Sequence, residues 1–318
     1  MPGVVLVVGS YNQDHVWTSD ELPAPGATRL GTYASGPGGK GFNQAVAASR
    51  AGARTGFLTA LGDDPAAATA RGLADAEAIE LLAEVHPALP SGTAGIFVDA
   101  AGRNVITVAP GANGALSPAY VRAARPAFAG ADVVLAQLEV APEAVLAALA
   151  LARECGATTL LNPAPANAPT SPQLLALADI LTPNETEFAA LLSRHAGNTV
   201  DADTLHTLAD DELHALCQSL QPATWVITLG GHGAFVSHAS GKHRGDHDDA
   251  YRAPAHPATP VDTTGAGDAF SGALAAALAA SPDAPFRDSV SFASRYAARS
   301  TERHGAALAM PRRGELAG

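Results

Sequence analysis

An acidic residue beside a glycine turn is the feature of this chain most able to do chemistry. Residues 262–270 read Asp-Thr-Thr-Gly-Ala-Gly-Asp-Ala-Phe and run into an alanine-rich stretch that predicts a helix. The free backbone N–H groups of Gly265, Ala266 and Gly267 at such a helix start would bind phosphate. The carboxylate of Asp268 would repel that phosphate, unless it removes a proton from a hydroxyl that attacks phosphorus. Asp268 is therefore a candidate general base, and the alternative is an ordinary helix-capping aspartate.

A second glycine-rich passage, at residues 36–52, also predicts a turn before a helix. Gly36, Gly38 and Gly41 fit the pattern G-x-G-x-x-G, but the first strand ends too far upstream for a dinucleotide fingerprint. The Gly-Lys pair at 39–40 is similar to a Walker A ending, but a glycine follows where Ser or Thr should hold magnesium. A dinucleotide-dependent oxidoreductase is therefore a weak hypothesis. Lys40, one of two lysines in the chain, and Asn43 are instead candidates to face a ligand at this turn.

The composition favours a folded protein with a large core. A length of 318 residues suits one large α/β domain or two domains, and 47% hydrophobic with 16% charged residues argues against disorder. The net charge of −12 argues against nucleic acid or an anionic membrane as partner. We find no signal-peptide pattern and no long apolar run, and Cys155 and Cys217 lack metal-ligand spacing. We therefore expect a cytoplasmic location.

Short β-rich runs alternate with helical runs along the chain. We expect strands at residues 4–8, 56–60, 133–138, 158–161, 179–182 and 225–229, and helices at 41–51, 142–154, 185–193, 211–220, 266–280 and 288–301. This alternation predicts an α/β fold with a mostly parallel, doubly wound sheet flanked by helices. Ligands bind beyond the carboxyl ends of such strands, where Glu139, Asn184 and Gly230 lie. We therefore expect one active-site cleft along this edge.

Two regions interrupt the alternation. Residues 13–18 and 28–35 read as strands, and residues 93–98 and 104–109 read as a hairpin. Together they could form a small sheet over the cleft, and the alternative is two surface excursions. The polar stretch at residues 239–249 reads as a solvated loop rather than a metal site, although it carries His243, His247 and Asp248.

Five passages in order make the chain similar to the ribokinase-like (PfkB) carbohydrate kinases. Residues 38–45, Gly-Gly-Lys-Gly-Phe-Asn-Gln-Ala, resemble the first signature of that family, and residues 262–268 resemble the second. Residues 9–14 precede the first signature, and residues 162–166 and 182–187 lie between the two, so the resemblance covers nearly the whole chain as a single kinase domain. The passages Asn-Pro-Ala-Pro-Ala and Asn-Glu-Thr-Glu are closer to the ribokinase branch than to fructokinases or adenosine kinases. The resemblance implies transfer of a phosphoryl group from ATP to a sugar hydroxyl.

The resemblance also implies which ligand each of several residues binds. The residues expected to bind the sugar are Asn12, Asp14, Gly38, Gly39, Lys40, Asn43, Glu139 and Asp268. The residues expected to bind the nucleotide are Asn184, Thr228, Gly230, Gly233 and Gly267. Magnesium is expected at Glu187, through water, although Asn184 and Glu187 could instead be a helix cap. A monovalent cation such as K⁺ is expected at Asp262, Thr264, Ser300, Arg303 and Gly305, mostly through carbonyls. Here Ala309 stands where a serine is common.

A lid and a dimer are further implications of the resemblance. The lid would comprise about residues 12–36 and 92–109, and it would also carry the contact of a homodimer. Tyr11 and Phe42 stand where smaller residues are common, and they could form a platform for a nucleoside base. A kinase for another pentose, a ketohexose or a nucleoside therefore stays open beside a ribose kinase. A non-catalytic sugar or nucleotide sensor is disfavoured, because Asp268 and its glycine turn are intact.

Overall fold

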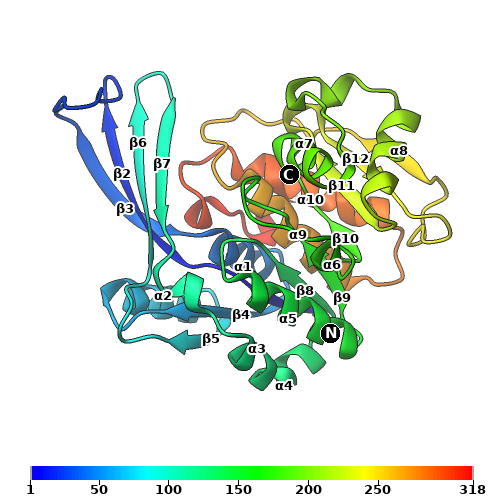
Figure 1. The fold of residues 1–318 in the computed structure, drawn as a ribbon, viewed down its shortest axis with the longest axis horizontal. Helices are drawn as coiled ribbons and strands as arrows, with labels where there is room; N and C mark the ends of the chain where they lie inside the picture. The colour runs from blue at the N-terminus through cyan, green and yellow to red at the C-terminus, as the bar shows by residue number, and fades with distance from the viewer. Residues whose placement is uncertain (1, 317–318) are drawn as a thin grey trace.

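The fold is built on one large, mostly parallel sheet, seen in a computed structural model that describes residues 2–316 (Figure 1). Its nine strands lie in the order β13-β12-β11-β10-β9-β8-β1-β4-β5. The strands are β1 (Val4–Val8), β4 (Arg54–Leu61), β5 (Ile79–Val85), β8 (Val133–Ala136), β9 (Thr158–Leu161), β10 (Ile180–Leu181), β11 (Thr224–Thr228), β12 (Ala234–Ser237) and β13 (Ala250–Ala253). Only the pairs β11–β12 and β12–β13 are antiparallel in this sheet. The predicted doubly wound α/β fold is confirmed.

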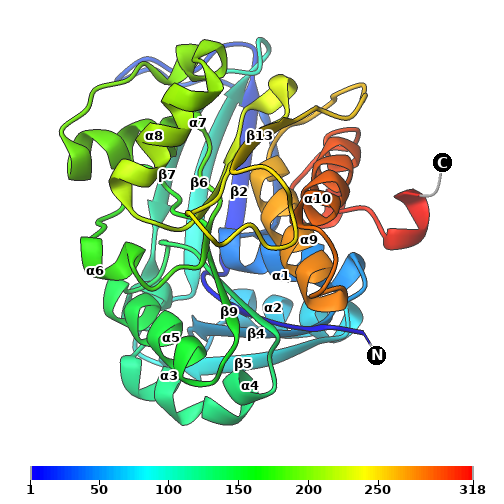
Figure 2. The ribbon, with the colours of Figure 1, turned by 90° about the vertical axis from the view of Figure 1, so that its right-hand side faces the viewer.

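Helices cover both faces of this sheet (Figure 2). One face carries α1 (Lys40–Arg50), α2 (Pro65–Ala76), α9 (Ala266–Ala280) and α10 (Phe286–Ser300). The other carries α3 (Pro118–Ala123), α4 (Arg125–Ala129), α5 (Pro142–Glu154), α6 (Pro172–Leu175), α7 (Glu185–Leu191) and α8 (Asp210–Leu220). Side chains of a strand alternate between faces, so Val5 and Val7 of β1 enter the first core, and Leu6 and Val8 the second. Both cores are apolar, which explains why the buried strands read as continuous hydrophobic runs.

A close approach between α1 and α9 sets the geometry of the site. A Cβ atom at Gly272 of α9 would lie 2.5 Å from the carbonyl oxygen of Gln44 in α1. No side chain fits there, so glycine allows the two helices to pack with their backbones nearly in contact. The first turns of α1 and α9, which carry the two glycine-rich signatures, are thereby brought together.

A second, four-stranded sheet projects from the body in Figure 1. It consists of β2 (Asn12–Ser19), β3 (Thr32–Gly38), β6 (Gly92–Asp99) and β7 (Asn104–Ala109), in the order β3-β2-β6-β7. The predicted hairpin is confirmed. The strand predicted at 28–35 is displaced, because residues 28–31 are exposed and lack strand pairing, whereas β3 pairs with β2 as far as Gly38.

The structure contains elements that the sequence patterns did not predict. These are α2, α3, α4, α6, β5, β12 and β13. Strands β5 and β13 lie at the two edges of the large sheet and are only partly buried, so their hydrophobic pattern is weak. Residues 239–249 form turns, as expected, and no cluster of potential metal ligands occurs among residues 2–316. Within the same range, none of the helices combines the length and the apolar character that a membrane crossing requires.

Candidate active site

The predicted polar residues meet at the carboxyl end of the large sheet. A pocket of about 130 Å³ opens there, lined by Lys40, Asn162, Thr182, Asn184, Glu187, Thr228, Thr263, Gly265, Ala266, Gly267 and Asp268. These residues follow β9 and β10, end β11, or lie at the starts of α1, α7 and α9. The two glycine-rich passages and the Asn-Glu-Thr-Glu passage therefore form one site, although they are far apart in the sequence.

The turn before α1 approaches the start of the small sheet. Gly39 has φ = 87°, and a Cβ atom there would lie 2.8 Å from the amide nitrogen of Asn12. The Lys40 N–H donates to Glu139 Oε2 at 3.0 Å, and the Ser10 hydroxyl donates to the same oxygen at 2.6 Å. Glu139 thus ties the first turn of α1 to the end of β1. Sequence analysis placed Glu139 at the site but did not identify Ser10.

Lys40 is the positive charge among several carboxylates. Burial lowers the pKa of its amino group, but the negative charges of Asp268, Glu139 and Glu187 outweigh that effect, so the pKa lies above its ordinary value. Lys40 therefore stays charged, and it can neutralise an anionic group that enters the pocket.

Asp268 occupies the first turn of α9 and is 6% exposed. Its Oδ2 accepts a hydrogen bond from Asn43 Nδ2 and its Oδ1 accepts one from Gln44 Nε2, each at 2.9 Å. Burial raises the pKa of this carboxyl, although Lys40 and the two amide donors oppose the shift. A buried carboxylate with a raised pKa, held beside an anion-binding turn, is suited to accept a proton.

The turn that precedes Asp268 exposes backbone donors. Gly265 is the N-cap of α9 with φ = 76°, a left-handed conformation that favours glycine. Within residues 2–316, the N–H groups of Gly265 and Gly267 have no hydrogen-bond acceptor, whereas Ala266 N–H donates to Thr263 O at 3.2 Å. The sequence analysis assigned all three amides to an anion. Two of them are unpaired here, and the third is already engaged.

Asn12 and Asp14 lie on one face of β2, beside the turn before α1. Asn113 Nδ2 donates to Asn12 Oδ1 at 2.9 Å, and the same side chain makes hydrogen bonds with the backbone of Tyr11. Burial and the charges of Glu139 and Asp268 raise the pKa of Asp14 to about 7. These contacts fix the side chain of Asn12, and they leave Asp14 as a half-buried acceptor with an elevated proton affinity.

The absence of a side chain at Gly38 leaves the space that the Asp14 carboxylate occupies. A Cβ atom at Gly38 would lie 2.1 Å from Asp14 Oδ2, so any other residue at this position would displace the carboxylate. Asn113, like Ser10, was not identified from the sequence. It lies in a short 3-10 helix at Gly111–Ala115 after β7, and no local pattern links it to Asn12, 101 residues away.

Asn184 and Glu187 form a capping box at the start of α7. Asn184 Oδ1 accepts from Glu187 N–H at 2.8 Å, and Glu187 Oε2 accepts from Asn184 N–H at 2.9 Å. Both residues also line the pocket. Burial raises the pKa of the Glu187 carboxyl, while the Asn184 N–H and Lys40 oppose this shift. The helix cap, which the sequence analysis kept as an alternative, is therefore present, and it holds Glu187 toward the pocket.

Thr228, Gly230 and Gly233 follow one another at the end of β11. Thr228 forms a β-bridge with Asn184, so this turn adjoins the start of α7. Gly230 and Gly233 have φ of 51° and 88°, and a Cβ atom at Gly233 would lie 2.1 Å from Ala253 O. The two glycines therefore permit a tight, exposed turn beside the pocket.

The residues expected at a monovalent cation lie in the loop before α9 and at the end of α10 with the loop that follows it. Asp262 Oδ1 accepts from Thr264 N–H and its Oδ2 accepts from Gly305 N–H, each at 2.9 Å. The side chains of Ser300 and Arg303 have other partners, the carbonyl of Ala297 and the carboxylate of Glu315. Asp262 thus connects the two segments, and the Arg303 side chain is turned away to Glu315.

Tyr11 and Phe42 do not form a platform for a nucleoside base. Their relative exposures are 0% and 1%, and their rings pack edge to face with centroids 5.3 Å apart. Phe42 also contacts Phe57 in the core beneath α1. The expectation that these rings could face a ligand is wrong, because the large residues fill the core instead.

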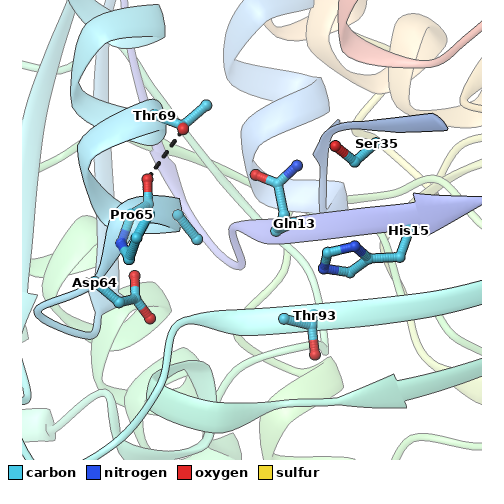
Figure 3. A pocket seen from close by; sticks show the side chains of 8 residues that line it. Gln13, His15, Ser35, Asp64, Pro65, Thr69 and Thr93 are labelled. Carbon is cyan, nitrogen blue, oxygen red and sulfur yellow. Dashed lines mark hydrogen bonds between the residues drawn. The ribbon is translucent and has the colours of Figure 1, made fainter.

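A second cavity lies on the opposite face of the small sheet. It measures about 380 Å³ and is lined by Gln13, His15, Ser35, Asp64, Pro65, Ala66, Thr69 and Thr93 (Figure 3). Gln13 and His15 alternate along β2 with Asn12 and Asp14, so the cavity is separated from the polar pocket by the sheet itself. None of the predicted site residues lines it.

Comparisons with known proteins show the family of the chain. Residues 4–313 match the profile of a family described as "pfkB family carbohydrate kinase". The ribokinase of Staphylococcus aureus is 36% identical over 314 residues, which cover 98% of this chain and 97% of that protein. The deoxyribokinase of Salmonella typhi is 33% identical over 276 residues, 85% of this chain and 84% of that one. A bifunctional ribokinase/ribose-5-phosphate isomerase A of Fructilactobacillus sanfranciscensis is 40% identical over 278 residues, 86% of this chain and 48% of that longer protein.

Solved structures extend the similarity to the whole fold. The ribokinase of Giardia lamblia superposes with a TM-score of 0.87 at 27% identity, covering 99% of this chain and 98% of that one. The ribokinase of Arabidopsis thaliana, complexed with ribose and ATP, superposes with a TM-score of 0.82 at 26% identity, covering 99% and 97%.

Proposed function

Because the chain belongs to the pfkB family of carbohydrate kinases, we propose that it is a ribokinase, which transfers the γ-phosphoryl group of ATP to D-ribose and forms ribose 5-phosphate. One observation carries the proposal. The carboxylate of Asp268 lies buried in the same pocket as Lys40 and the open turn at residues 265–267. A sugar hydroxyl and a terminal phosphate that meet there would find a base, a cation and backbone donors together.

The reaction follows from what each residue can do. Asp268 accepts the proton of the attacking hydroxyl, which then displaces the leaving diphosphate in line. The free amides of Gly265 and Gly267, at the positive end of α9, stabilise the charge on the transferred group. Ala266 supports the turn, and Lys40 neutralises phosphate oxygens.

The sugar end of the site offers both donors and acceptors. Asn43 Oδ1 is buried and has no donor within the described residues, while its Nδ2 donates to Asp268. This orphaned oxygen would accept a sugar hydroxyl. Asn12, Asp14, Gly38, Gly39 and Glu139 surround the remaining hydroxyls. Polar groups placed for hydroxyls discriminate against analogues that lack them, because the groups would be left unpaired.

The nucleotide would lie along the neighbouring turns. Asn184, Thr228, Gly230 and Gly233 adjoin the pocket, and the exposed glycine turn leaves room for phosphates at its backbone. ATP as the donor is supported by the Arabidopsis ribokinase complex.

The donor set of the pocket fits magnesium. Glu187 is buried with one oxygen in the capping box, and it faces the pocket beside Asp268 and Lys40, so it would hold the ion through water. Magnesium would neutralise the β- and γ-phosphate oxygens. The paired loops of Asp262, Thr264, Ser300, Arg303 and Gly305 fit a monovalent cation such as K⁺, which their carbonyls would bind.

We propose that the chain is a single kinase domain in which the small sheet is a lid. Asn12 and Asp14 stand on its pocket-facing side, so sugar binding would draw residues 12–36 and 92–109 over the site. On its other side, Trp17, Tyr33 and Phe97 form a stacked aromatic cluster with exposures of 40%, 56% and 40%. An exposed apolar patch of this kind favours a partner surface, and a homodimer through the lid would cover it.

Steady-state phosphorylation with a panel of acceptors tests the proposal. ADP release would be measured with ribose, deoxyribose, fructose, adenosine and a 2-keto-3-deoxy sugar acid, and kcat/KM compared. We expect ribose to be preferred. A nucleoside or another sugar that exceeds ribose by tenfold, about 1.4 kcal/mol, would overturn the ribokinase assignment and leave the family membership standing. Binding of sugar and ATP without any turnover would indicate a sensor.

A further inference from the structure

The second oxygen of the Asp268 carboxylate is held by a residue outside the assigned site. Asn43 Nδ2 contacts Oδ2, but Gln44 Nε2 contacts Oδ1 at 2.9 Å, and Gln44 is fully buried. The carboxylate plane is therefore defined by two amide donors on adjacent residues of α1. A carboxylate held at both oxygens cannot rotate about its last bond without losing a hydrogen bond.

The direction of the Gln44 amide is imposed from the core. The carbonyl of Thr182 can only accept, and Asn162 Nδ2 donates to it at 2.7 Å. Asn162 must therefore present Oδ1 to Gln44, whose Nε2 donates to it at 3.0 Å. The same nitrogen faces Asp268. A reversed Gln44 amide would place its oxygen against two acceptor oxygens, which is unfavourable in a buried site.

Gln137 completes the arrangement from the other side. Its Nε2 donates to Gln44 Oε1 at 2.6 Å, while its own Oε1 is buried and has no hydrogen-bond donor among the described residues. With Gln137 in this orientation, a reversed Gln44 would set two NH₂ groups against each other. Gln137 is 0% exposed and follows β8 at the carboxyl edge of the sheet. A Cβ atom at Gly9 would lie 1.9 Å from Gln137 Oε1, so glycine at position 9 provides the space for this side chain.

We propose that Gln44 and Gln137 are positioning residues for phosphoryl transfer, which together with Asn162 form a buried amide chain that fixes the orientation of the Asp268 carboxylate. The inference rests on the proposed role of Asp268 as general base. Neither glutamine needs to touch the sugar or the nucleotide. Both glutamine side chains are fully buried, so the orientation of the base depends on their amides together with Asn43, which holds the other carboxylate oxygen. A small misplacement of a reacting group can lower a rate about 100-fold.

The amide chain acts in a site of several charges. Lys40 from α1, Glu139 after β8, Glu187 from α7 and Asp14 from β2 all act on Asp268 through their charge. The Gln44 N–H favours the ionised carboxylate, so weakening that contact raises the pKa of Asp268. A disturbed amide chain therefore shifts the acidic limb of the pH profile to higher pH, which a purely structural role would not do.

The test uses Gln137→Met, which keeps the volume and removes the amide. We expect kcat to fall about 10- to 100-fold, KM for ribose and ATP to change by less than about threefold, and the acidic limb of kcat to move to higher pH. Gln218→Met is the matched control. Gln218 also donates a side-chain hydrogen bond, to Ser237 Oγ at 2.8 Å, but it lies on α8 away from the pocket. Its kinetics and pH profile should stay those of the parent.

Two outcomes would overturn the inference. One is a Gln137→Met protein with parental kcat and pH profile, and the other is a loss confined to KM or to thermal stability. Asp268→Asn, measured in parallel, separates the two hypotheses. An active Asp268→Asn protein contradicts the proposed base, whereas an inactive one beside a fully active Gln137→Met protein contradicts the amide chain alone.

A second variant covers a failure of Gln137→Met to fold. Gln137→Asn keeps a buried amide and shortens the side chain by one methylene group, so it cannot reach Gln44 as Gln137 does. The same fall in kcat and the same shift of the acidic limb are expected. Parental values for both in Gln137→Asn would contradict the proposal as well.

Discussion

The side-chain amide of Asn43 donates a 2.9 Å hydrogen bond to the carboxylate of Asp268, although 225 residues separate the two in the chain. The contact joins the first turn of α1 to the first turn of α9, and each of these turns is preceded by a glycine with positive φ. Asn43, a candidate sugar-binding residue, and Asp268, the candidate base, are thus held together before any substrate binds. Such preorganisation is a source of rate enhancement, because the site need not reorder during the reaction.

Replacement of the proposed base should abolish turnover. Asp268→Asn keeps the shape of the side chain and removes the proton acceptor, so kcat should fall by roughly 10²–10⁴-fold. Dissociation constants for ribose and ATP, measured by calorimetry, should stay within a few-fold of the parent. Asp283→Asn, at an exposed position after α9, is the control. Turnover within a few-fold of the parent would remove Asp268 from the role of base.

Loss of the Glu187 charge should increase the demand for magnesium. Glu187→Gln retains a capping side chain but weakens the attraction for a hydrated cation, so the magnesium concentration for half-maximal rate should rise about tenfold. Glu185→Gln, in the same helical turn but outside the pocket, serves as control. Full activity of the parent in excess chelator would show that no divalent ion is needed.

Asp14 destabilises the folded protein at and above neutral pH, because its pKa is raised in the folded state. Its folded-state pKa of about 7 exceeds the unfolded value, so the folded protein holds a proton that the unfolded chain releases, and stability falls as pH rises from about 4 to 7. Asp14→Asn should therefore raise the free energy of unfolding by about 1–2 kcal/mol at pH 8, after allowance for partial exposure. The gain should be smaller at pH 5, and KM for ribose should increase. Urea denaturation at both pH values measures this, and equal or lower stability at pH 8 would contradict it.

Sugar binding should order the lid. With saturating ribose, backbone amides of β2, β3, β6 and β7 should exchange more slowly with deuterium, since closure over the sugar excludes water. Peptides from α8, on the far side of the large sheet, provide the internal control. Unchanged exchange in residues 12–36 and 92–109 would argue against a lid.

The aromatic cluster of the small sheet should support a dimer. Trp17→Glu places a charge in the stacked cluster and should shift a dimer toward monomer in sedimentation experiments, because a buried unpaired charge is strongly disfavoured. Val85→Glu, at an exposed position on the edge strand β5, is the matched control. A parent protein that sediments as a monomer, or a Trp17→Glu protein that remains dimeric, would exclude this interface.

The sequence determined the fold class and most of the pocket through local patterns. Alternating apolar strands and helices predicted the doubly wound sheet, and the hairpin at β6 and β7 follows from two short strands around a turn. The Asn184–Glu187 spacing left a helix cap open beside a magnesium site, because a spacing of three residues places both side chains on one helical turn. Such features depend on neighbours in the chain, so they can be read without the structure.

Other elements escaped detection because their stabilising contacts are distant. The edge strands β5 and β13 carry mixed burial, and only pairing with β4 and β12 makes them strands. The predicted strand began too early, because residues 28–31 are exposed and do not pair with β2. Tyr11 and Phe42 could be assigned to a ligand surface only while their packing was unknown, because an aromatic residue near a glycine turn fits a core and a binding platform equally well.

The orientation of the active site was decided by tertiary structure alone. Gln44 was recognisable as part of a motif, but its contacts to Asp268, Asn162 and Gln137 span between 93 and 224 residues. No local pattern encodes the direction of a side-chain amide. For Gln44, that direction is set by acceptors on Asp268 and Asn162 and a donor on Gln137, which meet it only after α1, α9 and the strands of the sheet have packed together.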